Sequence, residues 1–171
     1  HNHNIHIGPI IRRESIYSHD LMEKRRKLFF ALFNFARRLP FLYICVKVKK
    51  SECSDIIELT TKLSKSIASV LITNMDYFNS FDNIILYYDN GQVELTKILT
   101  SVFNSLFSHI EFRKVSPADY KLFQVADLVR SMELIYEKIQ NKLLFQSEKE
   151  FFDSARDFKK NLYKHIYKKR L

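Results

Sequence analysis

The chain has 171 residues, 46% of them hydrophobic, so it is the size of one domain and has enough hydrophobic material for a substantial core. Its 2 glycines exclude a Gly-rich loop for nucleotide phosphates, and no hydrophobic run is long enough to cross a membrane. The net charge of +9 favours an anionic partner such as nucleic acid, although a source organism with Lys-rich proteins would give the same excess.

The first half of the chain predicts alternating strands and helices. Gly8-Pro9 ends the first strand, and Pro40 ends the first helix. The predicted elements are a strand at residues 5–7, a helix at about 21–38, a buried strand at 41–46, and a helix from Ser54 or Asp55 to about residue 71.

The second half continues this alternation. The run at residues 84–88 is uninterrupted and rich in β-branched and aromatic residues, which is typical of a strand buried on both faces. Ser116-Pro117-Ala118-Asp119 has the residues of a helix start. The predicted elements are that strand, a helix from Val93, a strand at 110–115, a helix from 117 to about 141, and shorter helices at about 147–154 and 158–169.

This order predicts an α/β fold: a mixed, largely parallel sheet with helices on both faces and extra C-terminal helices. Cys45 and Cys53 match neither a metal-binding spacing nor a disulfide framework, and the N-terminal residues lack the layout of a signal peptide. We therefore expect a cytoplasmic protein with reduced thiols and no membrane segment.

Two acidic residues are candidates for chemistry. Asp89 follows the buried strand at the edge where α/β sheets bind ligands, and Asp127 lies with Gln124 on the least polar part of the late helix. If the fold brings the two carboxylates together, they would suit Mg²⁺ or Mn²⁺ and the hydrolysis of phosphodiesters. Alternatively, Asp89 is only a turn residue, and Asp127 only accepts a hydrogen bond from a Tyr, Arg130 or Ser131.

Other residues allow two interpretations each. His6 is either a general acid or base, or a partly exposed strand histidine. The C-terminal segment either binds nucleic acid or is an amphipathic helix with a solvated basic face. Glu133 is expected to be a solvated helix position. The residues proposed to contact nucleic acid are Lys159, Lys160, Lys164 and Lys168, with Tyr163 and Tyr167 among them.

Residues 87–99 and 111–127 resemble a bacterial and phage family known as domain of unknown function 3800, and Gln124 to Asp127 match its Gln-x-Ala-Asp signature. The resemblance extends to residues 5–14 and to the tail from Phe151. It implies a ribonuclease-H-like fold and a metal-dependent nuclease. In that fold Asp89 would lie on a central strand, Asp127 on the late helix, and His6 near the same pocket.

The sequence departs from that family at one motif. Members usually begin with a strand ending in Asp-Glu-Ser-Gly, which would supply a first metal ligand, and this sequence lacks it. We therefore expect residues 1–171 to form a single ribonuclease-H-like domain without its first strands. The alternative is a non-catalytic nucleic-acid-binding or assembly module of a phage or mobile-element system. Such a module would form a homo-oligomer or take strands from a partner.

Overall fold

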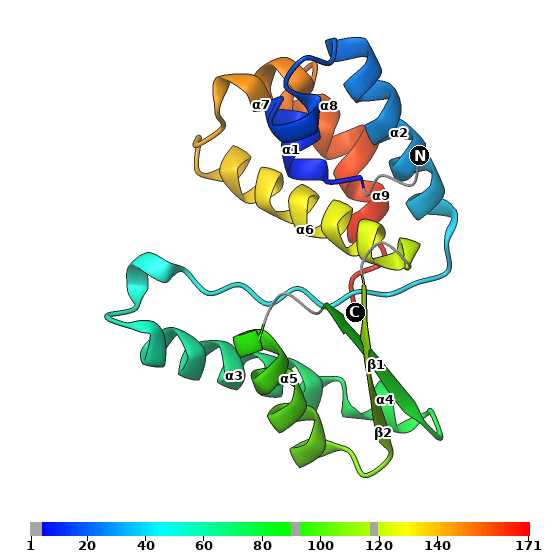
Figure 1. Cartoon of the computed structure of the whole chain (residues 1–171), viewed down its shortest axis with the longest axis vertical. Coiled ribbons are helices and arrows are strands. Elements are labelled where there is room, and N and C mark those ends of the chain that lie inside the picture. Colours follow the sequence, from blue (N-terminus) through cyan, green and yellow to red (C-terminus); the bar gives the residue numbers. More distant parts are fainter. Residues whose placement is uncertain (1–4, 90–92, 117–119) are drawn as a thin grey trace. The chain divides into compact units, whose positions relative to one another are not determined.

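The computed structural model describes residues 5–89, 93–116 and 120–171, and the side chain of Asp89 lies outside the described part. Internal contacts divide the chain into two compact units (Figure 1). The helical unit consists of His1–Tyr43 and Pro117–Arg170, and the α/β unit is Ile44–Ser116 with Leu171. The sequence alone predicts a single domain, whereas the contacts group its residues into these two units.

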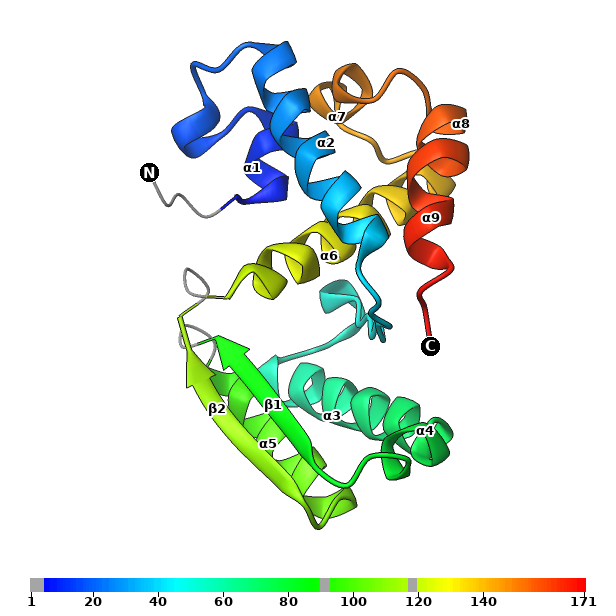
Figure 2. The same ribbon diagram turned by 90° about the vertical axis from the view of Figure 1, so that its right-hand side faces the viewer.

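Two long helices form the frame of the helical unit (Figure 2). They are α2 (Met22–Arg38) and α6 (Lys121–Gln140), and hydrophobic residues at helical spacing give each a buried face. The predicted start of α6 at Pro117 to Asp119 lies outside the described residues. The other elements are α1 (Ile7–Arg12), the 3-10 turn η1 (Ser15–Tyr17), α7 (Gln146–Phe151), α8 (Ala155–Asp157), the π-helical turn η3 (Phe158–Tyr163) and α9 (Lys164–Tyr167).

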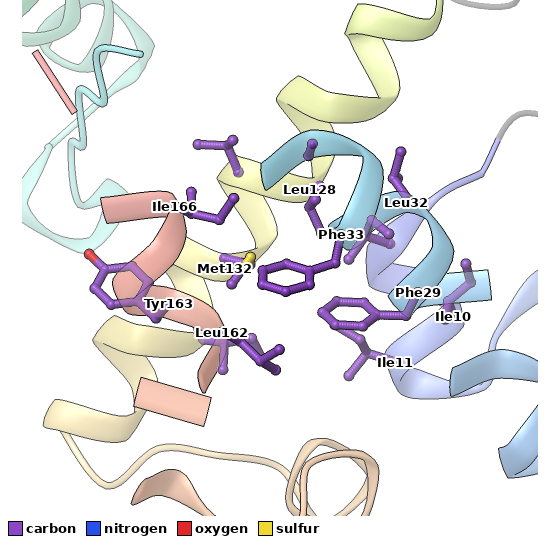
Figure 3. Close-up of a cluster of buried hydrophobic side chains, with 14 of the residues drawn as sticks. Ile10, Ile11, Phe29, Leu32, Phe33, Leu128, Met132, Leu162, Tyr163 and Ile166 are labelled. Atoms are coloured by element: carbon purple, nitrogen blue, oxygen red, sulfur yellow. The ribbon is translucent and has the colours of Figure 1, made fainter. Parts of the chain in front are cut away.

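The core of the helical unit combines side chains from both ends of the sequence (Figure 3). Phe29 and Phe33 of α2 lie parallel with ring centres 6.4 Å apart, and Leu128 and Met132 of α6 and Ile166 of α9 surround them. Burying one such side chain stabilises a fold by about 1.5–3 kcal/mol. This cluster therefore joins the two sequence segments that make up the unit.

The prediction of a strand at residues 5–7 is wrong, because Ile7 begins helix α1. Ile7, Ile10 and Ile11 are all buried, and their spacing is that of one helix face rather than of a strand. Pro9 does not prevent this helix. It occupies the first turn, where a backbone N–H has no partner within the helix.

The predicted strand at residues 41–46 is also absent. Within the described residues, the segment forms one isolated parallel β-bridge, between Tyr43 and Arg170, and no strand. Phe41 and Tyr43 pack against the hydrophobic core of the helical unit, and Ile44 packs against that of the α/β unit.

The α/β unit contains the two predicted strands that form, but the strand at residues 84–88 is not buried on both faces as predicted, because Ile85 and Tyr87 are exposed. Strand β1 (Ile84–Asp89) pairs in parallel with β2 (Ile110–Val115), in a register that places Ile84 opposite Ile110. Helix α5 (Val93–Leu106) connects them, as expected for parallel neighbours. The other elements are the 3-10 turn η2 (Lys50–Glu52), α3 (Ile56–Thr73) and α4 (Met75–Asn79).

The expected ribonuclease-H-like sheet with helices on both faces is contradicted. The described residues are 66% helical, and they form one sheet of two strands. Leu86 and Phe112 face the hydrophobic cluster around Leu71, Phe103 and Phe107, whereas the opposite face of the strands is exposed. The prediction fails because two of its four strands do not form.

Candidate functional site

A pocket of about 150 Å³ opens between α1 and α6 in the helical unit. His6 and Asp127, two residues that the sequence singles out, lie together in its lining. Most of the other polar residues that line the pocket are charged. The polar and charged lining residues are His6, Arg12, Asp127, Arg130, Ser131 and Glu148.

Asp127 holds the first turn of α1 in place. Its Oδ2 accepts a hydrogen bond of 2.9 Å from the backbone N–H of Ile7, the first residue of α1. Its Oδ1 accepts one of 3.1 Å from Arg130, whose side chain is 78% exposed. The α1 N-terminus has no side-chain cap from His6, so a carboxylate on another helix satisfies this donor. This geometry matches the alternative role expected from the sequence, in which Asp127 accepts a hydrogen bond from Arg130.

A buried arginine binds the opposite end of α1. Nη1 of Arg25, on α2, donates to the carbonyl oxygens of Ile10 at 2.7 Å and Ile11 at 3.2 Å. Burial lowers the pKa of Arg25. With Asp127 at the N-terminus and Arg25 at the C-terminus, both charges complement the helix dipole of α1.

Two guanidinium groups line the pocket beside these contacts. Arg12 forms two hydrogen bonds of 2.9 Å to Glu14, and this contact raises the pKa of Arg12 and lowers that of Glu14. Arg130 is largely in solvent, apart from its bond to Asp127. Two guanidinium groups that line one pocket can together bind phosphate oxygens. Glu148, in contrast, is buried and bonded to Lys138 at 2.6 Å.

The described residues do not form a metal centre. They contain no group of three His, Cys, Asp or Glu side chains placed to hold an ion. Asp89 ends β1 in the α/β unit, with its side chain outside the described part, so its pairing with Asp127 stays a prediction. Gln124 is half-buried on α6, one turn before Asp127, and does not line the pocket.

Glu133 is not the solvated position that the sequence predicts. It is 2% exposed, and its Oε1 accepts hydrogen bonds from the hydroxyls of Tyr43 at 2.7 Å and Tyr163 at 3.1 Å. Arg170 lies 3.9 Å from the same oxygen. Burial, together with this carboxylate, raises the pKa of both tyrosines. Glu133 lies four residues after Val129, on the buried side of α6, and that spacing was the signal for its burial.

The C-terminal helical stretch presents three exposed lysines, Lys160, Lys164 and Lys168, spaced four residues apart. We call this set the basic face. None of the three forms an ion pair in the part of the chain that the structure describes. Three regularly spaced cations in solvent can bind successive phosphates.

Two of the residues proposed to contact nucleic acid are used inside the helical unit instead. The ring of Tyr163 is buried and stacks on Tyr136 at 4.1 Å, so it does not reach a base. Lys159 is half-buried, with Nζ 3.4 Å from Oε1 of Gln140 and 5.7 Å from the Tyr136 ring centre. Tyr167 is exposed and remains able to stack.

More cations lie near the C-terminal end of the basic face. Nζ of Lys169 donates to the Leu39 carbonyl at 2.5 Å, which places the ends of α2 and α9 side by side. Arg37 and Arg38 are exposed in the last turn of α2. Cations at helix C-termini are also favoured by the helix dipole.

The net charge of the chain is confined to one unit. The helical unit contains 20 Lys and Arg against 11 Asp and Glu, and the α/β unit contains 8 against 8. The whole excess of +9 therefore belongs to the helical unit. A charge imbalance of proteome-wide origin has no reason to divide in this way, so the division favours a specific anionic partner.

Comparison of the chain with protein-family models, curated proteins and solved structures finds no match. None of the described helices has the length and hydrophobicity needed to span a bilayer.

Proposed function

We propose that this protein binds nucleic acid through the basic face of its helical unit. The observation that carries the proposal is the division of charge, with the excess of +9 in the helical unit and none in the α/β unit. Lysines on an exposed helix bind backbone phosphates and release the counterions that surround them. Such binding is strong at low salt and has little sequence preference.

The basic face makes the proposal quantitative. On duplex DNA each neutralised phosphate contributes about 0.9 to the slope of log affinity against log salt concentration. Replacing Lys160, Lys164 and Lys168 by Gln should therefore flatten the slope by about 2.7. Between about 50 and 200 mM salt, the affinity of the variant should fall about 40-fold less than that of the parent.

The experiment is a fluorescence-anisotropy titration of labelled duplex DNA and single-stranded RNA at several salt concentrations. The control variant replaces three exposed lysines of the α/β unit, Lys50, Lys65 and Lys97, by Gln. Both variants lose three positive charges, so non-specific attraction by net charge falls equally. We expect the slope to flatten only in the basic-face variant. Equal slopes in the two variants, or no binding by the parent at low salt, would contradict the proposal.

Metal-dependent cleavage of nucleic acid is our second candidate, and one observation favours it. His6 and Asp127 share a pocket with Arg12 and Arg130, whose guanidinium groups suit a phosphate. The described residues do not fit a metal ion on their own, because they contain no group of three His, Cys, Asp or Glu side chains placed to hold one. No catalytic step through a metal follows from them.

A cleavage assay separates the two candidates. Parent, Asp89→Asn and Asp127→Asn proteins are incubated with RNA, DNA and hybrid substrates in Mg²⁺, in Mn²⁺ and in chelator. Cleavage that needs a divalent ion and is lost in both variants supports the nuclease. Salt-dependent binding that is the same in chelator, without cleavage, supports the binding module alone.

A further inference from the structure

Tyr167 is the exposed aromatic residue of the C-terminal helical stretch. It is 52% exposed, whereas Phe158 and Tyr163 of the same stretch are buried. The Tyr167 ring lies beside that of Tyr163, with centres 5.6 Å apart, and the Tyr163 ring stacks on that of Tyr136 at 4.1 Å. The three rings therefore form a series that begins on α6 and ends in solvent at Tyr167.

This exposed ring lies among the lysines of the basic face. Tyr167 is three residues after Lys164 and directly before Lys168, and residues three apart on a helix are neighbours on its surface. Lysines that contact phosphates, together with an aromatic ring that stacks on a base, are the two parts of sites that bind single-stranded nucleic acid. The C-terminal stretch contains both parts on its exposed side.

Duplex and single-stranded nucleic acids differ in what they offer to Tyr167. In a duplex the bases stack on one another, and only their edges are accessible in the grooves. In a single strand the bases can separate from one another and stack on aromatic side chains. The lysines find phosphates on either form, but an exposed ring finds the face of a base only on a single strand.

The position of the neighbouring cations also favours a flexible strand. The His165 ring lies 6.4 Å from that of Phe33, so α2 runs beside the C-terminal stretch. Arg37 and Arg38 are exposed in the last turn of α2, so the cations lie on two different helices. A single strand can adapt its backbone to both helices, whereas duplex DNA is stiff over lengths of about 150 base pairs.

We propose that the basic face binds single-stranded nucleic acid in preference to duplex, with one base stacked on the ring of Tyr167. The inference rests on the proposed function and adds to it the class of nucleic acid. Lys164 and Lys168 bind the phosphates that flank the stacked base. The base extends the series of rings that runs from Tyr136 through Tyr163 to Tyr167.

Tyr167→Ala tests the stacking contact. The assay is fluorescence anisotropy at low salt with one labelled DNA strand of about 15 nucleotides, used free and annealed to its complement. The variant should bind the free strand about 5- to 150-fold more weakly than the parent and bind the duplex equally well. Tyr167→Phe keeps the ring and should bind both forms as the parent does. The matched control is Tyr77→Ala, which removes a 38% exposed tyrosine from the α/β unit and should change neither affinity.

A fluorescent side chain reports the contact directly and does not depend on the folding of the Ala variant. The chain contains no tryptophan, so Tyr167→Trp introduces a single indole at the proposed contact. A base stacked on an indole quenches its emission. We expect the free strand to quench Tyr167→Trp, the duplex to quench it much less, and neither to quench the control Tyr77→Trp. Equal quenching of Tyr167→Trp by strand and duplex, or none by the strand, overturns the proposal.

The results distinguish this inference from the proposed function. If replacing the three lysines of the basic face flattens the salt dependence but Tyr167→Ala binds the free strand as the parent does, nucleic-acid binding stands and the stacking contact is wrong. A parent that binds the duplex as tightly as the free strand also overturns the preference. A parent that binds neither form contradicts both proposals.

Discussion

Replacing Asp127 by Ala should loosen α1 without unfolding the rest of the helical unit. The variant loses the hydrogen bond of 2.9 Å to the Ile7 N–H and a negative charge beside the N-terminus of α1. A lost N-cap costs about 0.5–2 kcal/mol, and a lost charge–dipole contact about 0.3–1 kcal/mol. The sum is about 1–3 kcal/mol of local stability.

Amide hydrogen exchange measures this loss where it occurs. An opening free energy lower by about 1–3 kcal/mol speeds exchange by a factor of about 5 to 150. The probe is the N–H of Ile10, which bonds the His6 carbonyl at 3.2 Å in the first turn of α1. Asp127→Asn keeps an acceptor oxygen but loses the charge, so its exchange should lie between that of the parent and that of Asp127→Ala.

Arg130→Ala is the matched control for this prediction. It removes the other partner of Asp127, an exposed i,i+3 ion pair worth no more than about 0.5 kcal/mol. Exchange at Ile10 should therefore change little in this variant. If Asp127→Ala leaves exchange unchanged, or if Arg130→Ala speeds it as much, then Asp127 does not cap α1 and the reasoning is refuted.

The other predictions concern buried polar groups. Tyr163→Phe removes one donor to Glu133 and should lower the free energy of unfolding by about 1–3 kcal/mol, measured by urea denaturation; no change would mean that the contact is not formed. Because the folded state raises the pKa of Tyr43 and Tyr163, stability should fall as pH rises above about 10, the unfolded value, and Tyr43→Phe should weaken that pH dependence. Arg25→Met leaves the Ile10 and Ile11 carbonyls without this donor and should cost about 1–3 kcal/mol, seen as faster exchange in α1 and contradicted by parental rates.

Strong periodicity made most of the long elements predictable. The helices at about 21–38, from Asp55 onward and from Val93, and the strands at 84–88 and 110–115, are confirmed with small boundary shifts. Each contains enough residues for its hydrophobic spacing to identify a helix or a strand. The predictions for short segments were wrong because those segments contain too few residues for their spacing to distinguish a helix from a strand. Residues 5–7 alternate over three positions, and only Ile10 and Ile11 beyond them reveal the helical face of α1.

The roles of the candidate site residues depended on contacts distant in sequence. Nothing near Asp127 indicates that it caps a helix 120 residues earlier. The division of charge was equally hidden, because it appears only when residues 1–43 are grouped with residues 117–170. The burial of Glu133, in contrast, could have been predicted from the sequence, because its position falls on the hydrophobic side of α6.

The interruption of the helical unit by the α/β unit has a consequence for biosynthesis. The α/β unit is contiguous from Ile44 to Ser116, so its contacts can form as soon as that segment leaves the ribosome. The helical unit cannot complete its contacts until its C-terminal segment has been synthesised. For example, the Arg26 guanidinium donates a hydrogen bond to the carbonyl of Phe151, which lies 125 residues further along the sequence. Its contact order is accordingly high, and α1 and α2 stay exposed to proteases and chaperones until α6 and the C-terminal helices have been synthesised.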